Sequence, residues 1–140
     1  MIKLIMYTMS ILCIASFCDC NSSKGVKKEG AEVIKIGSGG GFAGKEMSLI
    51  IHDDGSLSSS TGDHYKKIKK EVLSQLLSNI AVLGIDKLDY NLPSNLYQFV
   101  EIKSGSDTKR LAWDPQSPEV PSSLKLFYNN INNIFKNSKK

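Results

Sequence analysis

The sequence predicts an α+β domain in which a small antiparallel sheet of about four to five strands carries two helices on one face. Short runs of β-branched and aromatic residues come in pairs, and each pair is joined by a segment that contains glycine. Two longer segments place apolar residues at helical spacing, one in the middle of the chain and one at its end. The predicted order is β-β-β-α-β-β-α, with a short third strand, in a single domain over residues 32–136.

The first part of the domain is predicted to contain strands joined by turns. Residues 32–37 and 46–52 carry the β-branched and aliphatic side chains that suit strands. Residues 38–44 between them form a loop dominated by glycine. The sequence Asp53-Asp54-Gly55-Ser56 predicts a tight hairpin turn, because Asp-Gly tolerates positive backbone φ angles. A short third strand over residues 56–60 should follow.

A helix is predicted over residues 64–83, with Asp63 as its N-cap and Gly84 as a left-handed C-terminal cap. Apolar residues recur at helical spacing and define a buried stripe, while four lysines face water. The stripe consists of Ile68, Val72, Leu73, Leu76, Leu77 and Ile80.

The last part of the domain begins with a loop over residues 85–95 that contains Pro93. Residues 97–103 and 108–114 are predicted as strands joined by a hairpin at residues 104–107. Trp113 alternates with Leu111 and is predicted to lie in the core. Prolines then break the chain, and Pro121 stands where a final helix over residues 122–136 can begin.

The N-terminus has the pattern of an export signal. Lys3 precedes an uncharged apolar run over residues 4–17, which is too short to span a bilayer core of about 30 Å. We predict a signal peptide over residues 1–19 and a flexible linker over residues 20–31, since the linker is polar and rich in glycine and lysine. The alternative is that the apolar run forms a buried helix of the domain.

All three cysteines, Cys13, Cys18 and Cys20, lie in or just after this run, so the predicted domain can form no disulfide. That distribution favours a bacterial lipoprotein over a disulfide-linked secreted protein. Ala15-Ser16-Phe17-Cys18 places small residues at two of the three positions before a cysteine, with the bulky Phe17 directly before it, and we predict that Cys18 is lipidated. An ordinary signal peptidase acting after Ala15 would instead release the protein. The expected location is the bacterial cell envelope, through a lipid anchor in a membrane, or the periplasm or medium.

Charge excludes nucleic acid as a partner. The chain has 140 residues and a formal net charge of +4, which becomes +3 if Lys3 is removed with the signal peptide. Arg110 is the only arginine, and no basic stripe interleaved with aromatic residues is present.

The glycine segment imitates two nucleotide-binding motifs. Gly39, Gly41 and Gly44 satisfy G-x-G-x-x-G, but a strand pattern follows where a helix would have to receive the pyrophosphate. Gly39 to Lys45 also imitates a P-loop, but Glu46 occupies the Ser/Thr position that would contact magnesium. We therefore predict no nucleotide and no other cofactor.

The sequence predicts no catalytic or metal site. His52, Asp53, Asp54, Asp63 and His64 match neither a zinc helix nor a calcium loop. No serine stands in G-x-S-x-G, and no cysteine lies in the domain. The protein is therefore expected not to be an enzyme.

The glycine motif and the order of the elements resemble the emfourin family, a group of small bacterial protein inhibitors of thermolysin-like metalloproteases. Three segments carry the resemblance: residues 40–44 (GGFAG), 71–77 (EVLSQLL) and 97–99 (YQF). Together with the element order, the resemblance covers about residues 33–135. It implies a small α+β scaffold whose partner is a secreted thermolysin-like metalloprotease.

Two functions remain open from the sequence. In the first, the chain is an exported, lipid-anchored, non-catalytic binding protein that inhibits such a protease through a protruding loop with an aromatic residue at its tip. The predicted partner-binding loop consists of Gly39, Gly40, Gly41, Phe42, Ala43 and Gly44. In the alternative, the chain is a structural or envelope-assembly lipoprotein, and the glycines only supply the φ angles of a wide connection between strands.

Overall fold

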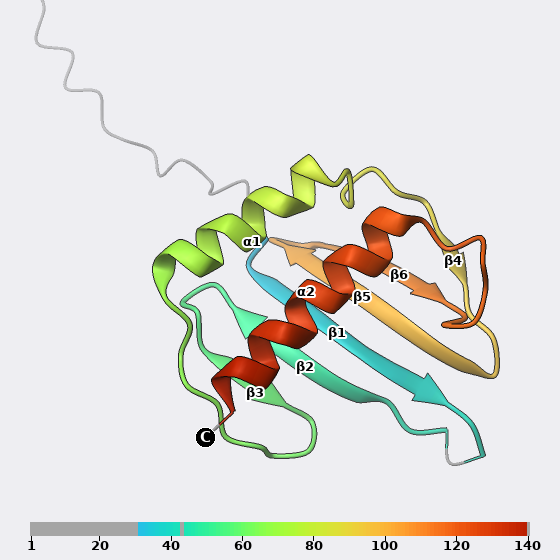
Figure 1. Cartoon of the computed structure of the whole chain (residues 1–140), viewed down its shortest axis with the longest axis horizontal. Helices are drawn as coiled ribbons and strands as arrows, with labels where there is room; N and C mark the ends of the chain where they lie inside the picture. The colour runs from blue at the N-terminus through green and yellow to red at the C-terminus, as the bar shows by residue number, and fades with distance from the viewer. Residues whose placement is uncertain (1–30, 43, 140) are drawn as a thin grey trace, which may run out of the picture.

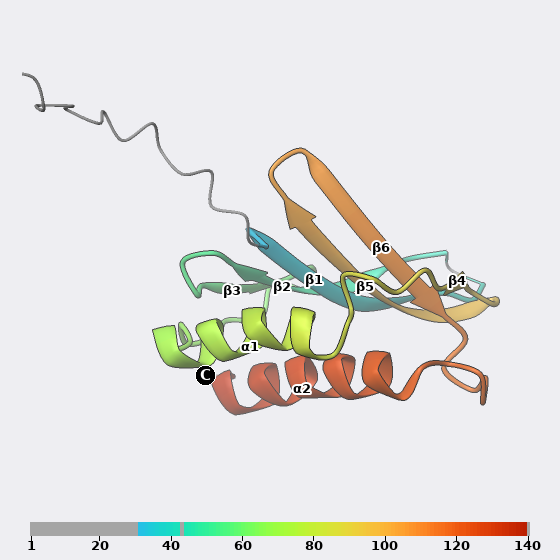
Figure 2. The ribbon, with the colours of Figure 1, turned by 90° about the horizontal axis from the view of Figure 1, so that it is seen from above.

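Six strands form a single mixed sheet, and two helices cover one of its faces (Figures 1 and 2). The computed structural model describes residues 31–42 and 44–139, so the predicted signal peptide, Cys18 and Ala43 lie outside the described residues. The α+β class predicted from the sequence is confirmed. The elements are β1 (Val33–Gly40), β2 (Met47–His52), β3 (Leu57–Ser59), α1 (Lys70–Val82), β4 (Asn91–Leu92), β5 (Leu96–Ser104), β6 (Asp107–Trp113) and α2 (Ser122–Ser138).

The sheet has one strand more than the sequence predicted, and it is not purely antiparallel. Its strand order is β3-β2-β1-β5-β6-β4. β4 lies within the segment predicted as a loop and pairs in parallel with Ala112 and Trp113 of β6. A two-residue strand is too short to show a periodic pattern, and the following Pro93 favours a break in structure.

The face of the sheet under the helices holds the main core. Since side chains alternate between the two faces of a strand, one cross-strand row on this face is uniformly apolar. The row consists of Leu49, Ile36, Val100 and Leu111 on β2, β1, β5 and β6. Trp113 is buried on the same face, as predicted, and its ring meets that of Tyr128 on α2 edge to face at 5.3 Å between centroids.

Helix α1 begins six residues later than predicted, and Asp63 does not cap it. The capping position is Lys69, whose side chain makes no capping hydrogen bond. The preceding segment uses its backbone groups elsewhere, because Lys66 N–H donates to the Ser138 carbonyl and Ile68 N–H donates to the Gly55 carbonyl. These tertiary hydrogen bonds hold residues 61–69 in a non-helical conformation, which the apolar spacing alone could not reveal.

The predicted hairpin turns are present. Gly55 has a φ of 83° and its N–H donates to the His52 carbonyl, which closes the turn between β2 and β3. Gly105, with a φ of 58°, begins the two-residue turn between β5 and β6. A positive φ at the first position of a two-residue hairpin loop matches the backbone twist of the flanking strands.

Strand β1 connects two different ends of the molecule. Its first residue, Val33, pairs with His52 and Lys103, whereas its last, Gly40, pairs with Leu96 at the start of β5. We call the end of the sheet around Gly40 and Leu96 the loop end. At about 3.3 Å per residue, β1 separates the two ends by about 23 Å. Within the described residues, no helix has the length and apolar character needed to cross a membrane.

Two leucines of α2 provide a matched test of this packing. Leu124 is completely buried against the sheet, whereas Leu126 has an exposed fraction of 59%. We expect Leu124→Ala to lower the free energy of unfolding by about 2–5 kcal/mol, because it leaves a cavity in the core. Leu126→Ala should change it by about 0.5 kcal/mol or less. Urea denaturation followed by circular dichroism measures both, and equal losses would contradict the assignment of the buried face.

Candidate functional site

The glycine segment forms the tip of the β1–β2 connection, but it is shorter than predicted. Gly39 and Gly40 belong to β1, where they pair with Tyr97 and Leu96, so the turn begins only at Gly41. Phe42 is fully exposed at this tip. The structure therefore corrects the start of the loop but keeps Phe42 at its exposed end.

The first leg of the loop requires glycine. Gly40 has a φ of 93°, and a side chain there would collide with the Asn95 carbonyl. Gly41 also has a positive φ, and its N–H donates to the same carbonyl at 2.8 Å. Because a residue with a Cβ is disfavoured in this conformation, glycine allows the chain to leave the sheet against the segment that precedes β5.

The second leg is fixed by Glu46, which directly precedes β2. Tyr97 donates its hydroxyl to Glu46 Oε1 at 2.8 Å, and Arg110 donates from Nη2 to the same oxygen. Lys35 Nζ lies 4.0 Å from Glu46 Oε2. These partners come from β5, β6 and β1, so the carboxylate joins the end of the loop to three strands.

Beneath these charges lies a second, smaller aromatic cluster on the sheet face opposite the helices. Phe99 is completely buried there, although it is not part of the main core. The Arg110 guanidinium lies 4.0 Å from the centroid of its ring and also donates to Glu101 at 3.0 Å. This cation–π contact covers the ring with a group that is already held by two carboxylates.

Glycines make room for these rings. Gly37 and Gly39 are the register partners of Phe99 and Tyr97. A Cβ on Gly37 would approach the Phe99 ring to 2.8 Å, and one on Gly39 would approach the Tyr97 ring to 2.7 Å. An aromatic side chain that lies over a strand glycine compensates for the missing packing at that glycine.

We name Glu46, Tyr97, Phe99 and Arg110 the clamp. Burial raises the pKa of Glu46, but hydrogen bonds from Tyr97 and Arg110 and the charges of Arg110 and Lys35 outweigh it and hold the pKa below its ordinary value. The hydrogen bond to Glu46 raises the pKa of Tyr97. The clamp therefore keeps Glu46 ionised, which maintains its bonds to both partners near neutral pH.

Sequence reasoning missed the clamp. In the sequence, Glu46 is 51 positions from Tyr97 and 64 positions from Arg110, so no local pattern joins these residues. One signal was present: the only arginine of the chain lies inside a strand, between Lys109 and the buried Leu111 and on the same face as Ala112, rather than at the exposed end of that strand.

Apolar side chains are also exposed around the loop end. Met47 and Leu96 each have an exposed fraction of 59%, and Leu92 has 60%. Met47 and Leu96 line a hollow of about 290 Å³ together with Tyr97 and Pro115. Exposed apolar residues that gather beside one loop are typical of an interaction surface.

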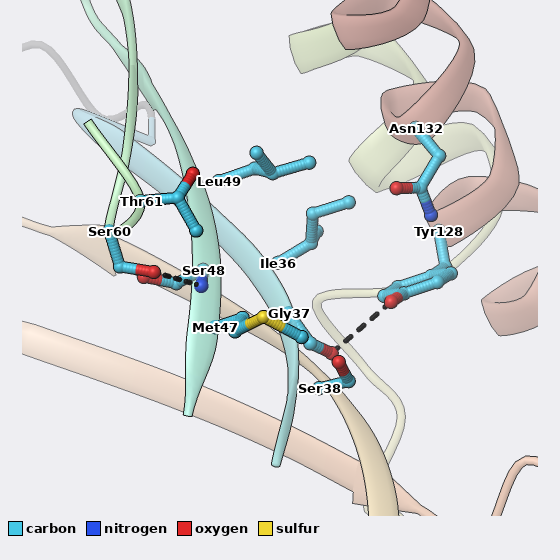
Figure 3. Close-up of a pocket in the computed structure, with 10 residues that line it drawn as sticks. All are labelled: Ile36, Gly37, Ser38, Met47, Ser48, Leu49, Ser60, Thr61, Tyr128 and Asn132. Atoms are coloured by element: carbon cyan, nitrogen blue, oxygen red, sulfur yellow. Dashed lines mark hydrogen bonds between the residues drawn. The ribbon is translucent and has the colours of Figure 1, made fainter. Parts of the chain in front are cut away.

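A second hollow, of about 230 Å³, opens on the helix-covered side of the same end (Figure 3). Its walls come from β1, β2, the chain after β3, and α2. Tyr128 of α2 projects toward Gly37 and Ser38 with Asn132 beside it, and the Tyr128 hydroxyl donates to the Gly37 carbonyl at 3.2 Å. Burial raises the pKa of Tyr128, although a hydrogen bond with Asn132 opposes the shift.

The remaining candidate residues have structural partners or lie exposed at the surface, as Asp53 does. His52 Nε2 lies 3.1 Å from Ser58 Oγ, and His64 is exposed. Asp54 accepts hydrogen bonds from Ser56, which hold its pKa well below the ordinary value. Asp63 accepts from Thr61 and pairs with Lys139. Within residues 31–42 and 44–139, no three His, Cys, Asp or Glu side chains gather where they could hold a metal ion.

Comparison with family models and with curated proteins adds no relative to this picture. No protein-family model matches the sequence, and no curated protein matches it. The emfourin-like character of the chain is therefore a proposal that rests on the three segments quoted above.

The clamp predicts a pH-dependent contribution to stability. Because the folded state holds the Glu46 pKa below its ordinary value of 4.5, the contribution is fully present above that pH and is lost as the pH falls through the folded-state pKa. We expect Glu46→Gln to be less stable than the unchanged protein at about pH 6, and the difference to shrink below about pH 4.5.

Urea midpoints of both proteins measured across this range test the prediction. Asp54 titrates in both proteins, so its effect cancels in the difference. A gap between the two midpoints that stays constant down to about pH 3 would show that Glu46 does not stabilise through its charge.

Proposed function

We propose that this chain is a non-catalytic binding protein that inserts Phe42 into a cleft of a protein partner. One observation carries the proposal: a fully exposed phenylalanine stands at the tip of a loop whose two legs are both fixed to the sheet. Burying such a side chain in a partner yields about 1.5–3 kcal/mol. Exposure of this ring in the free protein has no benefit for the fold itself.

The fixed legs support binding rather than mere exposure. Gly41 is bonded to the Asn95 carbonyl, and Glu46 is bonded to Tyr97 and Arg110. A loop that is ordered before binding loses less conformational entropy when the complex forms. The exposed Met47 and Leu96 extend the apolar contact surface beside Phe42.

The partner that we propose is a secreted thermolysin-like metalloprotease. Support comes from the resemblance of residues 40–44, 71–77 and 97–99 to emfourins and from the predicted export of the chain. An inhibitor of this kind needs a rigid scaffold and a loop that fits the cleft, and it needs no catalytic groups.

The geometry also suits a tethered protein. We propose that lipidation at Cys18 anchors the chain in the bacterial envelope. The described residues begin just before Val33, at the end of β1 opposite the loop end (Figure 1). A tether attached there leaves the loop end, with the exposed Phe42, at the opposite end of β1 from the point of attachment, where a soluble enzyme can reach it.

Titration of a thermolysin-type protease with the full chain tests the inhibitor proposal. We expect stoichiometric loss of peptidase activity, and an inhibition constant at least about tenfold weaker for Phe42→Asp, since a charge replaces the ring in the cleft. Leu126→Asp is the matched control, because it places the same charge at another exposed apolar position, on α2. Inhibition equal in the two variants would exclude the loop, and absence of inhibition by the unchanged protein would favour an envelope-assembly role.

The anchor is tested separately. We expect the chain expressed in a bacterial host to partition into the detergent phase, and Cys18→Ser to move it to the aqueous phase or to leave it unprocessed. Substitution of Cys20 by serine is the control, because the charged Asp19 directly precedes Cys20. Identical partitioning of all three proteins would refute lipidation at Cys18.

A further inference from the structure

The helix-covered face of the sheet changes character at the loop end. The apolar row with Ile36 and Val100 is followed by a second cross-strand row, which lies two residues closer to the loop end on every strand. This row consists of Met47, Ser38, Gln98 and Trp113. Ser38 and Gln98, at its centre, are polar and only half-buried. They occupy positions that would belong to the core if α2 extended over them.

Three hollows along this row share their walls. The hollow in Figure 3 shares Ser38 and Met47 with the hollow beside Leu96, and it shares Tyr128 with a third hollow of about 230 Å³. The hollow beside Leu96 and the third hollow share Gln98 and Pro115. They therefore form one elongated depression, which we call the tip groove, between α2 and the loop end.

We propose that the tip groove receives an extended, uncharged peptide segment of the partner. This inference rests on the proposed function, because it assigns a second contact to the partner that receives Phe42. The row crosses four strands, and three strand spacings of about 4.8 Å give a length of about 14 Å. An extended peptide of about four residues has that length.

The chemistry of the groove matches a peptide backbone. Its central polar groups are neutral amides and hydroxyls, from Ser38, Gln98 and Asn132 among others, which can both donate and accept hydrogen bonds. The exposed Met47 and Leu96 can contact apolar side chains of the segment. Lysines stand only at the margins, Lys45 and Lys125, and no acidic residue lines any of the three hollows.

Two other chain-like ligands fit less well. A phosphate-bearing chain needs a series of basic groups, and Lys125 already donates to the Ser117 carbonyl. A glycan would stack on exposed aromatic faces. Trp113 and Tyr128 have exposed fractions of 1% and 8% and lie against each other, so neither presents a free ring face. Tyr97, the third aromatic residue of the lining, extends to the opposite face of the sheet, where its hydroxyl is bonded to Glu46.

The first test uses a capped neutral pentapeptide, acetyl-Ser-Ala-Leu-Gly-Ala-amide, added to the ¹⁵N-labelled full chain in detergent micelles. We expect saturable NMR shifts at the amides of Ser38, Gln98 and Asn132, with a dissociation constant of about 1 mM. Ser38→Ile fills the groove and should abolish the shifts. Thr108→Ile is the matched control, because it introduces the same isoleucine on the opposite face of the sheet, in β6, and should leave the shifts unchanged.

A second variant tests the groove without added bulk that could disturb the fold. Gln98→Ala removes the central amide without adding bulk, and the peptide should bind it about tenfold more weakly. The proposal is overturned if the peptide gives no saturable shifts, if both groove variants bind it normally, or if a neutral oligosaccharide produces the shifts in its place.

The protease titration separates this inference from the proposed function. Phe42 does not line the groove, so Phe42→Asp should still bind the pentapeptide while it loses inhibition. Ser38→Ile should weaken inhibition about tenfold, whereas Thr108→Ile should leave it within about twofold. If Ser38→Ile inhibits normally but Phe42→Asp does not, the loop binds the protease and the groove does not.

Discussion

The contact between Arg110 and the Phe99 ring organises the half of the molecule that carries the loop. It buries an aromatic side chain on the sheet face that no helix covers, and it places the guanidinium where it reaches both Glu101 and Glu46. The same sheet thus supports two apolar clusters, a large one under the helices and a small one under a layer of charges. The first holds the fold together, and the second gives the loop end a defined shape.

Local chemistry explains why most elements were predictable. Alternating apolar residues marked β1, β2, β5 and β6, and α2 was marked by its apolar spacing after Pro121. Gly55 and Gly105 marked the hairpins because each takes a positive φ. The errors arose where distant partners decide the conformation: Ser138 and Gly55 bond the chain before α1, and β6 recruits the two residues of β4.

The candidate site was predictable only in part, for a related reason. The exposed tip followed from glycines that surround a single aromatic residue. Gly39 and Gly40 were wrongly assigned to the loop. They belong to β1 because its pairing with β5 continues as far as Leu96, which no feature of the glycines themselves indicates. The clamp unites residues 46, 97 and 110 through side chains alone. The tip groove depends on where α2 stops covering the sheet, which is a property of tertiary packing.

The close approach of Phe99 to Gly37 has a consequence for how this sequence can change over time. No side chain fits at position 37 while a ring occupies position 99, since even a methyl group would meet both the ring and the Met47 carbonyl. A relative that keeps this sheet can acquire a side chain at 37 only if the residue at 99 shrinks and the backbone of β2 at Met47 also moves away. Arg110 then loses the surface that it covers. Positions 37, 99 and 110 should therefore vary as a correlated group, even though they lie on three different strands.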